Sequence, residues 1–140
     1  MRVLSDSYKA TWKAEIQKVH DADIDTKLGT YFLVNPEMKD PNLFYNGRTF
    51  ESDRILLTRF RTGSHNLRIE TGRHCYPKIS RERRLCTCDD GIQTISHVLL
   101  HCRLLRHLQN EELDSVEKCF EWEGIYEYLL NASRILNIEC

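Results

Sequence analysis

Three cysteines and one histidine near the middle of the 140-residue chain have the types and the spacing of metal ligands. Cys86 and Cys88 are separated by one residue. His97 and Cys102 follow an Asp-Asp-Gly turn, which lets the chain reverse so that the cysteine pair faces the start of the next helix. Three thiolates and one imidazole form a ligand set for tetrahedral zinc. Because four protein ligands leave no open coordination position, we expect a structural Zn²⁺ ion and no hydrolytic zinc chemistry.

The five-residue spacing of His97 and Cys102 sets a condition on the local structure. Residues five apart on a regular α-helix are separated by about 140° around the axis and cannot both point at one ion. We therefore expect a distorted or late-starting helix here. His101 is an alternative ligand because it lies four residues after His97 on the same helical face, and His74 and Cys75 are further candidates. The structural alternative is that the cysteines are small buried residues on a leucine-rich helix.

Other features of the sequence favour an intracellular binding protein over a secreted protein or an enzyme. No secretory signal is present, so we expect the nucleus or cytoplasm, where clustered cysteines bind metal more often than they form disulfides. The longest apolar runs cover residues 31–34 and 125–130, the second interrupted by Glu127, and both are far below the roughly 20 residues that a membrane span needs. No Gly-rich phosphate loop, HExxH motif or Gly-x-Ser-x-Gly motif is present. We therefore expect that the protein is not an enzyme and does not associate with membranes.

The net charge of −1 is the sum of two blocks of opposite sign. Residues 48–87 contain ten Lys and Arg against four acidic residues, a net charge of +6. Residues 107–140 contain eight acidic residues against two basic ones, a net charge of −6. An arginine-rich block suits phosphate recognition, because the guanidinium fork matches two phosphate oxygens. The alternative is that the two blocks dock on each other.

Hydrophobic periodicity predicts a mainly α fold with a short irregular, zinc-knuckle-like centre, and a small α+β fold is the alternative. Helices are expected over about residues 6–20, 53–62, 94–109, 113–124 and 125–136. Ser52 is expected to cap the second helix, and Gly63 to follow its last turn. Residues 31–34 are expected to be extended, and residues 64–85 irregular.

The predicted elements fall into three regions. The N-terminal helix and loops occupy residues 1–50, the basic helix and the zinc-binding region occupy 51–109, and acidic helices occupy 110–140 and pack on the same core. Two apolar stripes mark the buried faces of the first two helices. They comprise Tyr8, Trp12, Ile16 and Val19 in the first helix, and Ile55, Leu56 and Phe60 in the second, with Arg54, Arg59 and Arg61 off the stripe.

The basic run Arg61-Thr62-Gly63-Ser64-His65-Asn66-Leu67, continued through residues 81–88 to the spaced His97 and Cys102, resembles a known family. It is similar to the C-terminal zinc-binding region of reverse transcriptases of LINE-type (non-LTR) retrotransposons, closely over about residues 50–106. The resemblance implies a nucleic-acid-binding region beyond the polymerase, with the three cysteines and the histidine in the zinc ligand positions. Since 140 residues cannot hold a polymerase, we expect a separated tail of such an element, relic or domesticated.

The sequence therefore predicts a non-catalytic, zinc-stabilised module that binds RNA or DNA through its basic segment. The residues expected to contact phosphate are Arg59, Arg61, His65, Arg68, Arg73, Arg81, Arg83 and Arg84. One alternative is a protein-interaction or oligomerisation module, in which the acidic C-terminal helices from Glu111 onward dock a protein partner or a second copy. A relic open reading frame without selected function is the other.

Overall fold

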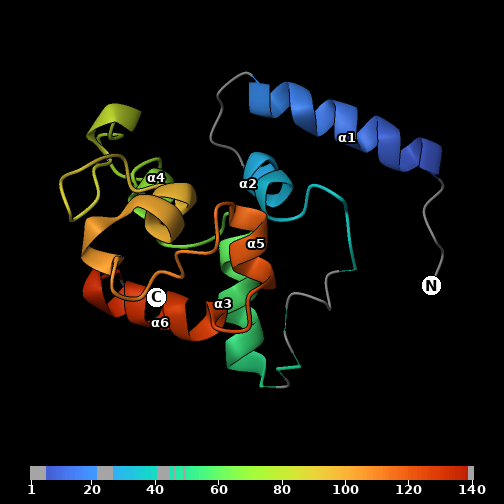
Figure 1. Ribbon diagram of the computed structural model, residues 1–140. Coiled ribbons are helices and arrows are strands. Elements are labelled where there is room, and N and C mark those ends of the chain that lie inside the picture. Colours follow the sequence, from blue (N-terminus) through green and yellow to red (C-terminus); the bar gives the residue numbers. More distant parts are fainter. Residues whose placement is uncertain (1–5, 22–26, 41–44, 46, 49, 139–140) are drawn as a thin grey trace.

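The computed structural model describes residues 6–21, 27–40, 45, 47–48 and 50–138, and this part of the chain is mainly helical, as the sequence predicts. Figure 1 shows its helices. The α-helices are α1 (Asp6–Asp21), α2 (Lys27–Val34), α3 (Glu51–Arg61), α4 (Arg68–Thr71), α5 (Val116–Glu121) and α6 (Ile125–Ile135). The shorter elements are the 3₁₀ turns η2 (Arg81–Arg83) and η4 (Arg103–Leu105) and the π-helical turn η3 (His97–His101).

A continuous apolar core joins α3, α5 and α6 to the middle of the chain. Leu57 of α3, Phe120 of α5 and Leu129 of α6 are fully buried in it. Helix α6 packs on α3, α5 and η4, and α5 also packs on α2 and η3. The three cysteines of the predicted ligand set belong to the same core, so the candidate metal centre is built into the fold.

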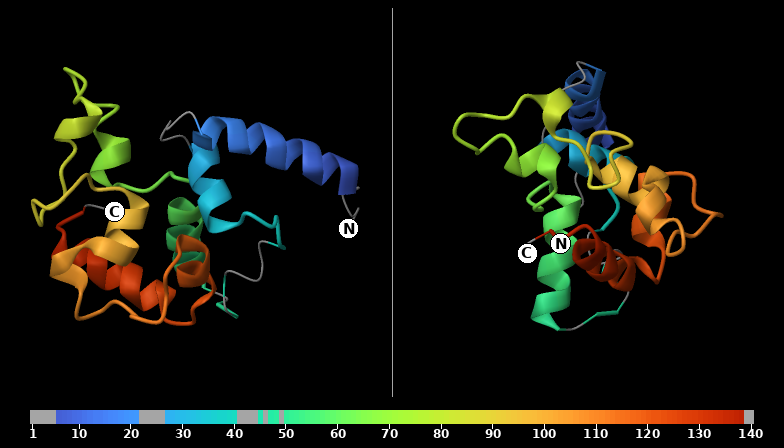
Figure 2. Two further views of the ribbon diagram at one scale, coloured as in Figure 1. Left: turned by 45° about the horizontal axis from the view of Figure 1, so that its top comes forward. Right: turned by 90° about the vertical axis from the view of Figure 1, so that its left-hand side faces the viewer.

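Helix α1 covers the predicted range and extends away from the rest of the molecule in the left view of Figure 2. It packs on α2. Ile16 is buried, whereas Tyr8 and Trp12 are 47% and 38% exposed, with their ring centroids 6.4 Å apart. The predicted stripe is therefore buried at Ile16 and open to solvent at these two aromatic residues; the Val19 side chain lies outside the described part.

The prediction of an extended segment at residues 31–34 is wrong, because these residues form the end of α2. A short apolar run does not by itself distinguish a strand from a buried helix. In the helix, Val34 is fully buried in the core. The buried Asn35 then ends the element: its backbone N–H donates to the Tyr31 carbonyl, and its Oδ1 accepts from the Lys39 N–H at 2.8 Å.

Helix α3 differs from its prediction in which side chains it buries. Leu57 and Phe60 face the core, whereas Ile55 is 42% exposed. The N-cap residue is Phe50, without a side-chain cap, so the capping role expected for Ser52 is wrong. Gly63 does follow the helix, with φ +71°, and a Cβ there would lie 3.1 Å from the Lys27 Cα. This conformation and this contact both favour glycine.

The middle and end of the chain combine confirmed and corrected elements. The continuous helix predicted over residues 94–109 is wrong, because the backbone changes from the π turn η3 to the 3₁₀ turn η4 and then to turns. The segment 64–85 is mostly irregular, as expected, but contains the short helices α4 and η2. Helix α5 is shorter than predicted and begins after Ser115, whose side chain accepts from the Lys118 N–H. Helix α6 matches its predicted range.

Candidate metal centre

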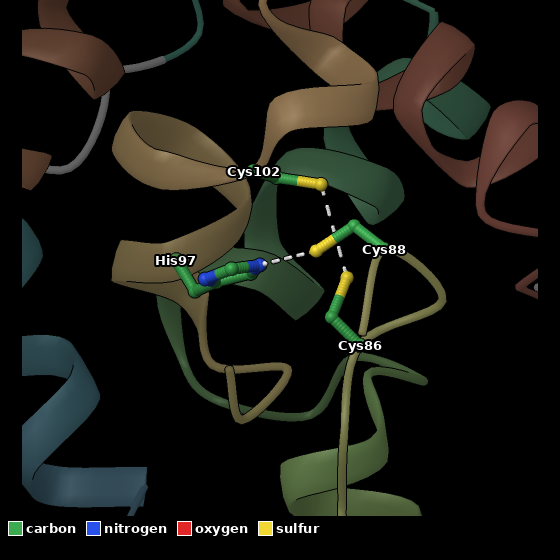
Figure 3. Close-up of side chains that lie close together, drawn as sticks. All are labelled: Cys86, Cys88, His97 and Cys102. Carbon is green, nitrogen blue, oxygen red and sulfur yellow. Dashed lines mark hydrogen bonds between the residues drawn. The ribbon is translucent and has the colours of Figure 1, made fainter. Parts of the chain in front are cut away.

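The four predicted ligands come together in one buried cluster, shown in Figure 3. The ligand atoms of Cys86, Cys88, His97 and Cys102 all lie within 4.8 Å of one another. Each of the three cysteines is at most 2% exposed, and His97 is 8% exposed. The cluster could therefore hold a metal ion away from solvent.

The separation of two of the sulfurs matches that expected around a tetrahedral ion. With Zn–S bonds of about 2.3 Å, two thiolates on one tetrahedral zinc lie about 3.8 Å apart. The Cys86 and Cys102 sulfurs are 3.8 Å apart, and the Cys88 sulfur is 3.2 Å from His97 Nε2. This S₃N donor set suits zinc.

The π-helical turn η3 solves the spacing problem between His97 and Cys102. The Cys102 N–H donates to the His97 carbonyl oxygen at 2.7 Å, a hydrogen bond between residues five apart. This wider turn brings both side chains to the same side, so the expectation of a distorted helix is confirmed. The Tyr128 hydroxyl of α6 donates to the Val98 carbonyl oxygen inside the turn and ties it to the core.

A tight loop presents the first two cysteines. The Cys86 N–H donates to the Gly91 carbonyl oxygen at 2.8 Å, and the Asp89 N–H donates to the Cys86 carbonyl oxygen at 3.0 Å. The loop turns through Asp89 with φ +58° and Gly91 with φ +145°. A Cβ on Gly91 would lie 3.3 Å from His97 Nδ1, so the glycine also lets the ring approach.

Arg103, directly after the last ligand, reaches back across this loop. Its Nη2 donates to the Cys88 carbonyl oxygen at 2.7 Å. This charged hydrogen bond joins the loop of Cys86 and Cys88 to the segment that follows η3. It adds to the contacts that the four ligands make with one another.

The alternative ligands lie outside the cluster. His101 and His74 are exposed, and so is Cys75, whose thiol donates to the Thr71 carbonyl oxygen at 3.5 Å. Among the residues that the structure describes, the group that could hold a metal consists of the four predicted ligands. Cys119 is buried apart from it.

Burial favours the neutral forms of Cys102 and His97 unless a bound cation compensates the charge. Burial raises the pKa of the Cys102 thiol to about 12, against a smaller lowering by a backbone hydrogen bond from Leu104. Burial also lowers the pKa of His97, and the neighbouring His101 lowers it further. A neutral imidazole is the ligand form of histidine, and a bound metal cation supplies the charge that thiol ionisation needs.

Gln93 is a supporting residue that the sequence reasoning missed. It is 1% exposed, and its Nε2 donates to the Cys86 sulfur at 3.7 Å. Its Oε1 accepts from the Arg68 N–H at 2.8 Å, and its carbonyl oxygen accepts from the Ile69 N–H at 3.3 Å. Gln93 therefore links a metal ligand to α4. A single polar residue between Ile92 and Thr94 carries no spacing signal that reveals this role.

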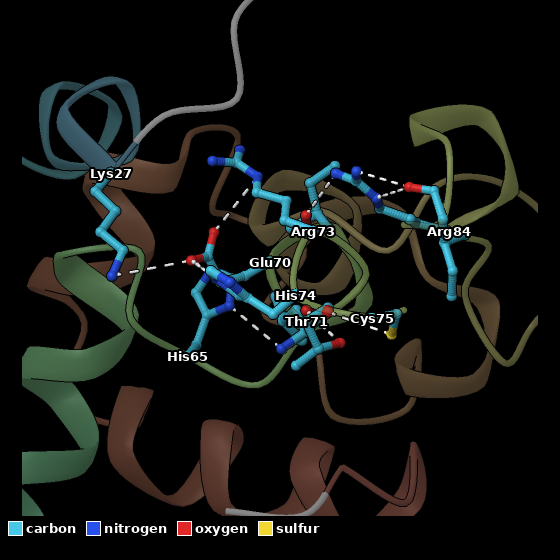
Figure 4. Close-up of polar contacts among 11 residues, drawn as sticks. Lys27, His65, Glu70, Thr71, Arg73, His74, Cys75 and Arg84 are labelled. Carbon is cyan, nitrogen blue, oxygen red and sulfur yellow. Dashed lines mark hydrogen bonds and ion pairs between the residues drawn. The ribbon is translucent and has the colours of Figure 1, made fainter. Parts of the chain in front are cut away.

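Three of the eight predicted phosphate-contacting residues are buried, which corrects the expectation that all eight lie on an open face. Arg61, His65 and Arg84 are 3%, 5% and 6% exposed. His65 Nδ1 accepts from the Leu67 N–H at 3.2 Å, and burial lowers the pKa of His65 to about 4. Arg84 donates to the carbonyl oxygens of Ile79 and Ile69, as Figure 4 shows. These buried side chains stabilise the fold of residues 61–84.

Arg73 is half-buried and belongs to an ion cluster around Glu70 (Figure 4). The Glu70 carboxylate lies 3.3 Å from His74 Nε2, 3.6 Å from Arg73 Nε and 3.9 Å from Lys27 Nζ. Because Lys27 begins α2, this cluster connects α2 to α4. The remaining predicted residues lie at the surface: Arg59, Arg68 and Arg83 are exposed and Arg81 is partly exposed.

The acidic C-terminal helices pair with two basic residues that precede α3 in the sequence. Glu117 and Glu121 of α5 bind Lys39, and Glu127 of α6 binds Arg48. Arg48 also stacks on Tyr126, 4.2 Å from the ring centroid. The two charge blocks therefore meet at Arg48.

Of the surface arginines, Arg59, Arg68 and Arg83 form no ion pair within the described residues. They are available to an external anion.

Comparisons with known proteins give no match: no family model, curated protein or solved structure is similar to this chain. The resemblance to LINE-type reverse transcriptases therefore stays a prediction. Among the described residues, none of the helices combines the length and apolar character needed to cross a membrane.

Proposed function

We propose that this protein is a non-catalytic, zinc-stabilised module that binds nucleic acid. The observation that carries the proposal is the buried convergence of three cysteines and one histidine at distances suited to tetrahedral zinc. All four positions around such an ion are taken by protein ligands, so its role is structural. The ion joins the Cys86 loop to the η3 turn and fixes the adjoining basic segment.

The metal part of the proposal is tested with a pair of cysteine variants. The wild-type protein is expected to contain about one Zn²⁺ per chain and to lose thermal stability in a strong chelator, because metal binding and folding are coupled. Cys102→Ser should lose both the zinc and the stability, since it removes a buried ligand. The exposed Cys75→Ser is the matched control and should keep both. Zinc-free wild-type protein of unchanged stability would contradict the proposal.

The nucleic-acid part rests on the surface arginines Arg59, Arg68, Arg81 and Arg83. Four phosphate contacts predict a slope of about −3 for log affinity against log salt on a single strand, or about 50-fold weaker binding at 200 mM than at 50 mM salt. The resemblance to a reverse transcriptase tail supports the same reading. Fluorescence anisotropy with labelled single-stranded RNA and DNA measures the slope.

A triple variant separates this proposal from the protein-interaction alternative. The variant replaces Arg59, Arg68 and Arg83 by Ala. It keeps the metal ligands and removes three of the four proposed phosphate contacts. Loss of binding supports the nucleic-acid module. Unchanged binding together with a changed oligomeric state in sedimentation would favour a protein-interaction module.

A further inference from the structure

A groove of about 350 Å³ lies between α4 and the end of α6, directly beside the candidate metal centre. Its polar lining includes Asn66, Arg68 and Thr71, and its apolar lining includes Leu136 and Ile138. The buried Gln93, which donates to the Cys86 sulfur, also lines it.

Arg68 lies at this groove with its guanidinium held in place. Its Nη1 donates to the Leu85 carbonyl oxygen at 2.7 Å, and its backbone N–H donates to Gln93 Oε1. A guanidinium has five N–H donors in a rigid fork, so this anchored side chain keeps donors for a phosphate. Because the side chain is already positioned, it loses little conformational entropy on binding.

The lining has the chemistry of a site for a flat ligand with polar edges. The partly exposed Ile138 and the largely buried Leu136 form its apolar side. The Asn66 amide and the Thr71 hydroxyl, which donates to the Leu67 carbonyl oxygen at 3.4 Å, form its polar side. The volume lies at the lower end of the range of about 300–1,000 Å³ typical of small-ligand sites. The anchored cation Arg68 suits a phosphate, and the apolar surface with its polar groups suits the adjoining base.

We propose that this groove binds one unstacked nucleobase of a single strand while Arg68 contacts the adjoining phosphate. The inference rests on the proposed function and deepens it, because it selects single strands over duplexes. Bases within a duplex are stacked and paired, whereas single-stranded bases can turn out into a pocket. Gln93 connects the groove to the metal centre, so the ligand cluster also fixes the groove's shape.

The test compares strands with and without bases on the zinc-loaded full chain. The probes are an oligothymidylate and an oligouridylate of about 12 nucleotides, each paired with an abasic strand of the same sugar and length. The wild-type protein should bind the base-containing strand about tenfold more tightly than its abasic partner for at least one sugar. Equal binding within both pairs overturns the groove proposal.

A pair of variants locates the effect. Thr71→Phe fills the groove and should remove the difference between base-containing and abasic strands, provided that circular dichroism and zinc content match the wild type. Arg83→Ala is the control: it removes one exposed arginine on η2, which does not line the groove, and should weaken binding to all probes equally. If folded Thr71→Phe still binds base-containing strands more tightly than abasic strands, the nucleobase does not bind in this groove.

The outcomes distinguish this inference from the proposed function. Salt-dependent binding with equal affinity for base-containing and abasic strands overturns the groove proposal and still supports the nucleic-acid-binding module. Absence of salt-dependent binding to every probe overturns both.

Discussion

The amide nitrogen of Gln93 donates to the sulfur of Cys86 across 3.7 Å, while the amide oxygen of the same side chain accepts from the Arg68 N–H. One buried side chain therefore connects the candidate metal centre to the first residue of α4. A hydrogen bond to a ligand sulfur stabilises its thiolate form, which is the form that binds metal. The metal centre and the basic segment are thus mechanically linked.

Replacing Gln93 by Leu should weaken both zinc binding and α4. Loss of the donor to Cys86 should lower zinc affinity about tenfold, and the unpaired Arg68 N–H should cost about 1–3 kcal/mol of unfolding free energy. Competition with a chelator dye measures the first effect, and urea unfolding measures the second. Gln109→Leu is the control because Gln109 donates to the Cys102 carbonyl oxygen and not to its sulfur; equal losses in both variants would contradict the role of Gln93.

The neighbouring Arg83 and Arg84 should show opposite phenotypes. Arg84→Met removes the donor to the buried carbonyl oxygens of Ile79 and Ile69 and should cost about 2–3 kcal/mol of unfolding free energy. Arg83→Met changes an exposed residue and should stay within about 0.5 kcal/mol of the wild type, while weakening nucleic-acid binding. Chemical unfolding and anisotropy measure the two effects. Equal destabilisation by both changes would contradict the assignment.

The ligand set could be predicted from sequence because coordination chemistry depends on residue type and spacing. Three thiols and one imidazole define the donor set, and the five-residue spacing of His97 and Cys102 already requires a non-α backbone. The structure contains a π turn closed by the hydrogen bond between these two residues. The sequence alone could not distinguish this turn from a helix that starts late. That choice depends on tertiary partners such as Tyr128, which are distant in sequence.

Burial of charged residues was the main feature that the sequence could not reveal. Arg83 and Arg84 are identical in type and adjacent, yet only the second is surrounded by carbonyl oxygens. The same limit explains why Ile55 was expected to be buried in place of Leu57, since both lie in one apolar run and the packing partners decide. Periodicity gives a helix, but its orientation comes from the elements that pack on it.

Stability should fall in mild acid through His65. Burial lowers its pKa to about 4 in the folded protein, whereas an unfolded histidine titrates near 6.5. The unfolded chain therefore takes up the proton first, and the stability present above about pH 6.5 decreases as the pH falls toward 4. The contribution of this one group between pH 7 and pH 5 is about 2 kcal/mol.

The variant His65→Asn isolates this contribution from other groups that titrate in the same range. The difference in unfolding free energy between the wild type and His65→Asn should shift by about 2 kcal/mol, in disfavour of the wild type, from pH 7 to pH 5. Urea unfolding at both pH values measures it, with the zinc content of both proteins matched. A difference independent of pH would show that His65 titrates normally in the fold.

Adding one methyl group at Gly91 should act on the metal centre through His97. Gly91 has φ +145°, a conformation that other residues rarely adopt, and a Cβ there would lie 3.3 Å from His97 Nδ1. Gly91→Ala should therefore lower zinc affinity about tenfold or more, as expected when a ligand's orientation is disturbed. Gly47→Ala is the control, because Gly47 has φ +73° but a Cβ there meets no atom within 4 Å. The backbone cost is about 1–2 kcal/mol at Gly47 and larger at Gly91, so urea unfolding of both variants is measured beside zinc affinity. A loss of zinc affinity in Gly47→Ala would trace the effect to global stability, whereas a loss in Gly91→Ala that exceeds its change in unfolding free energy assigns it to the contact with His97.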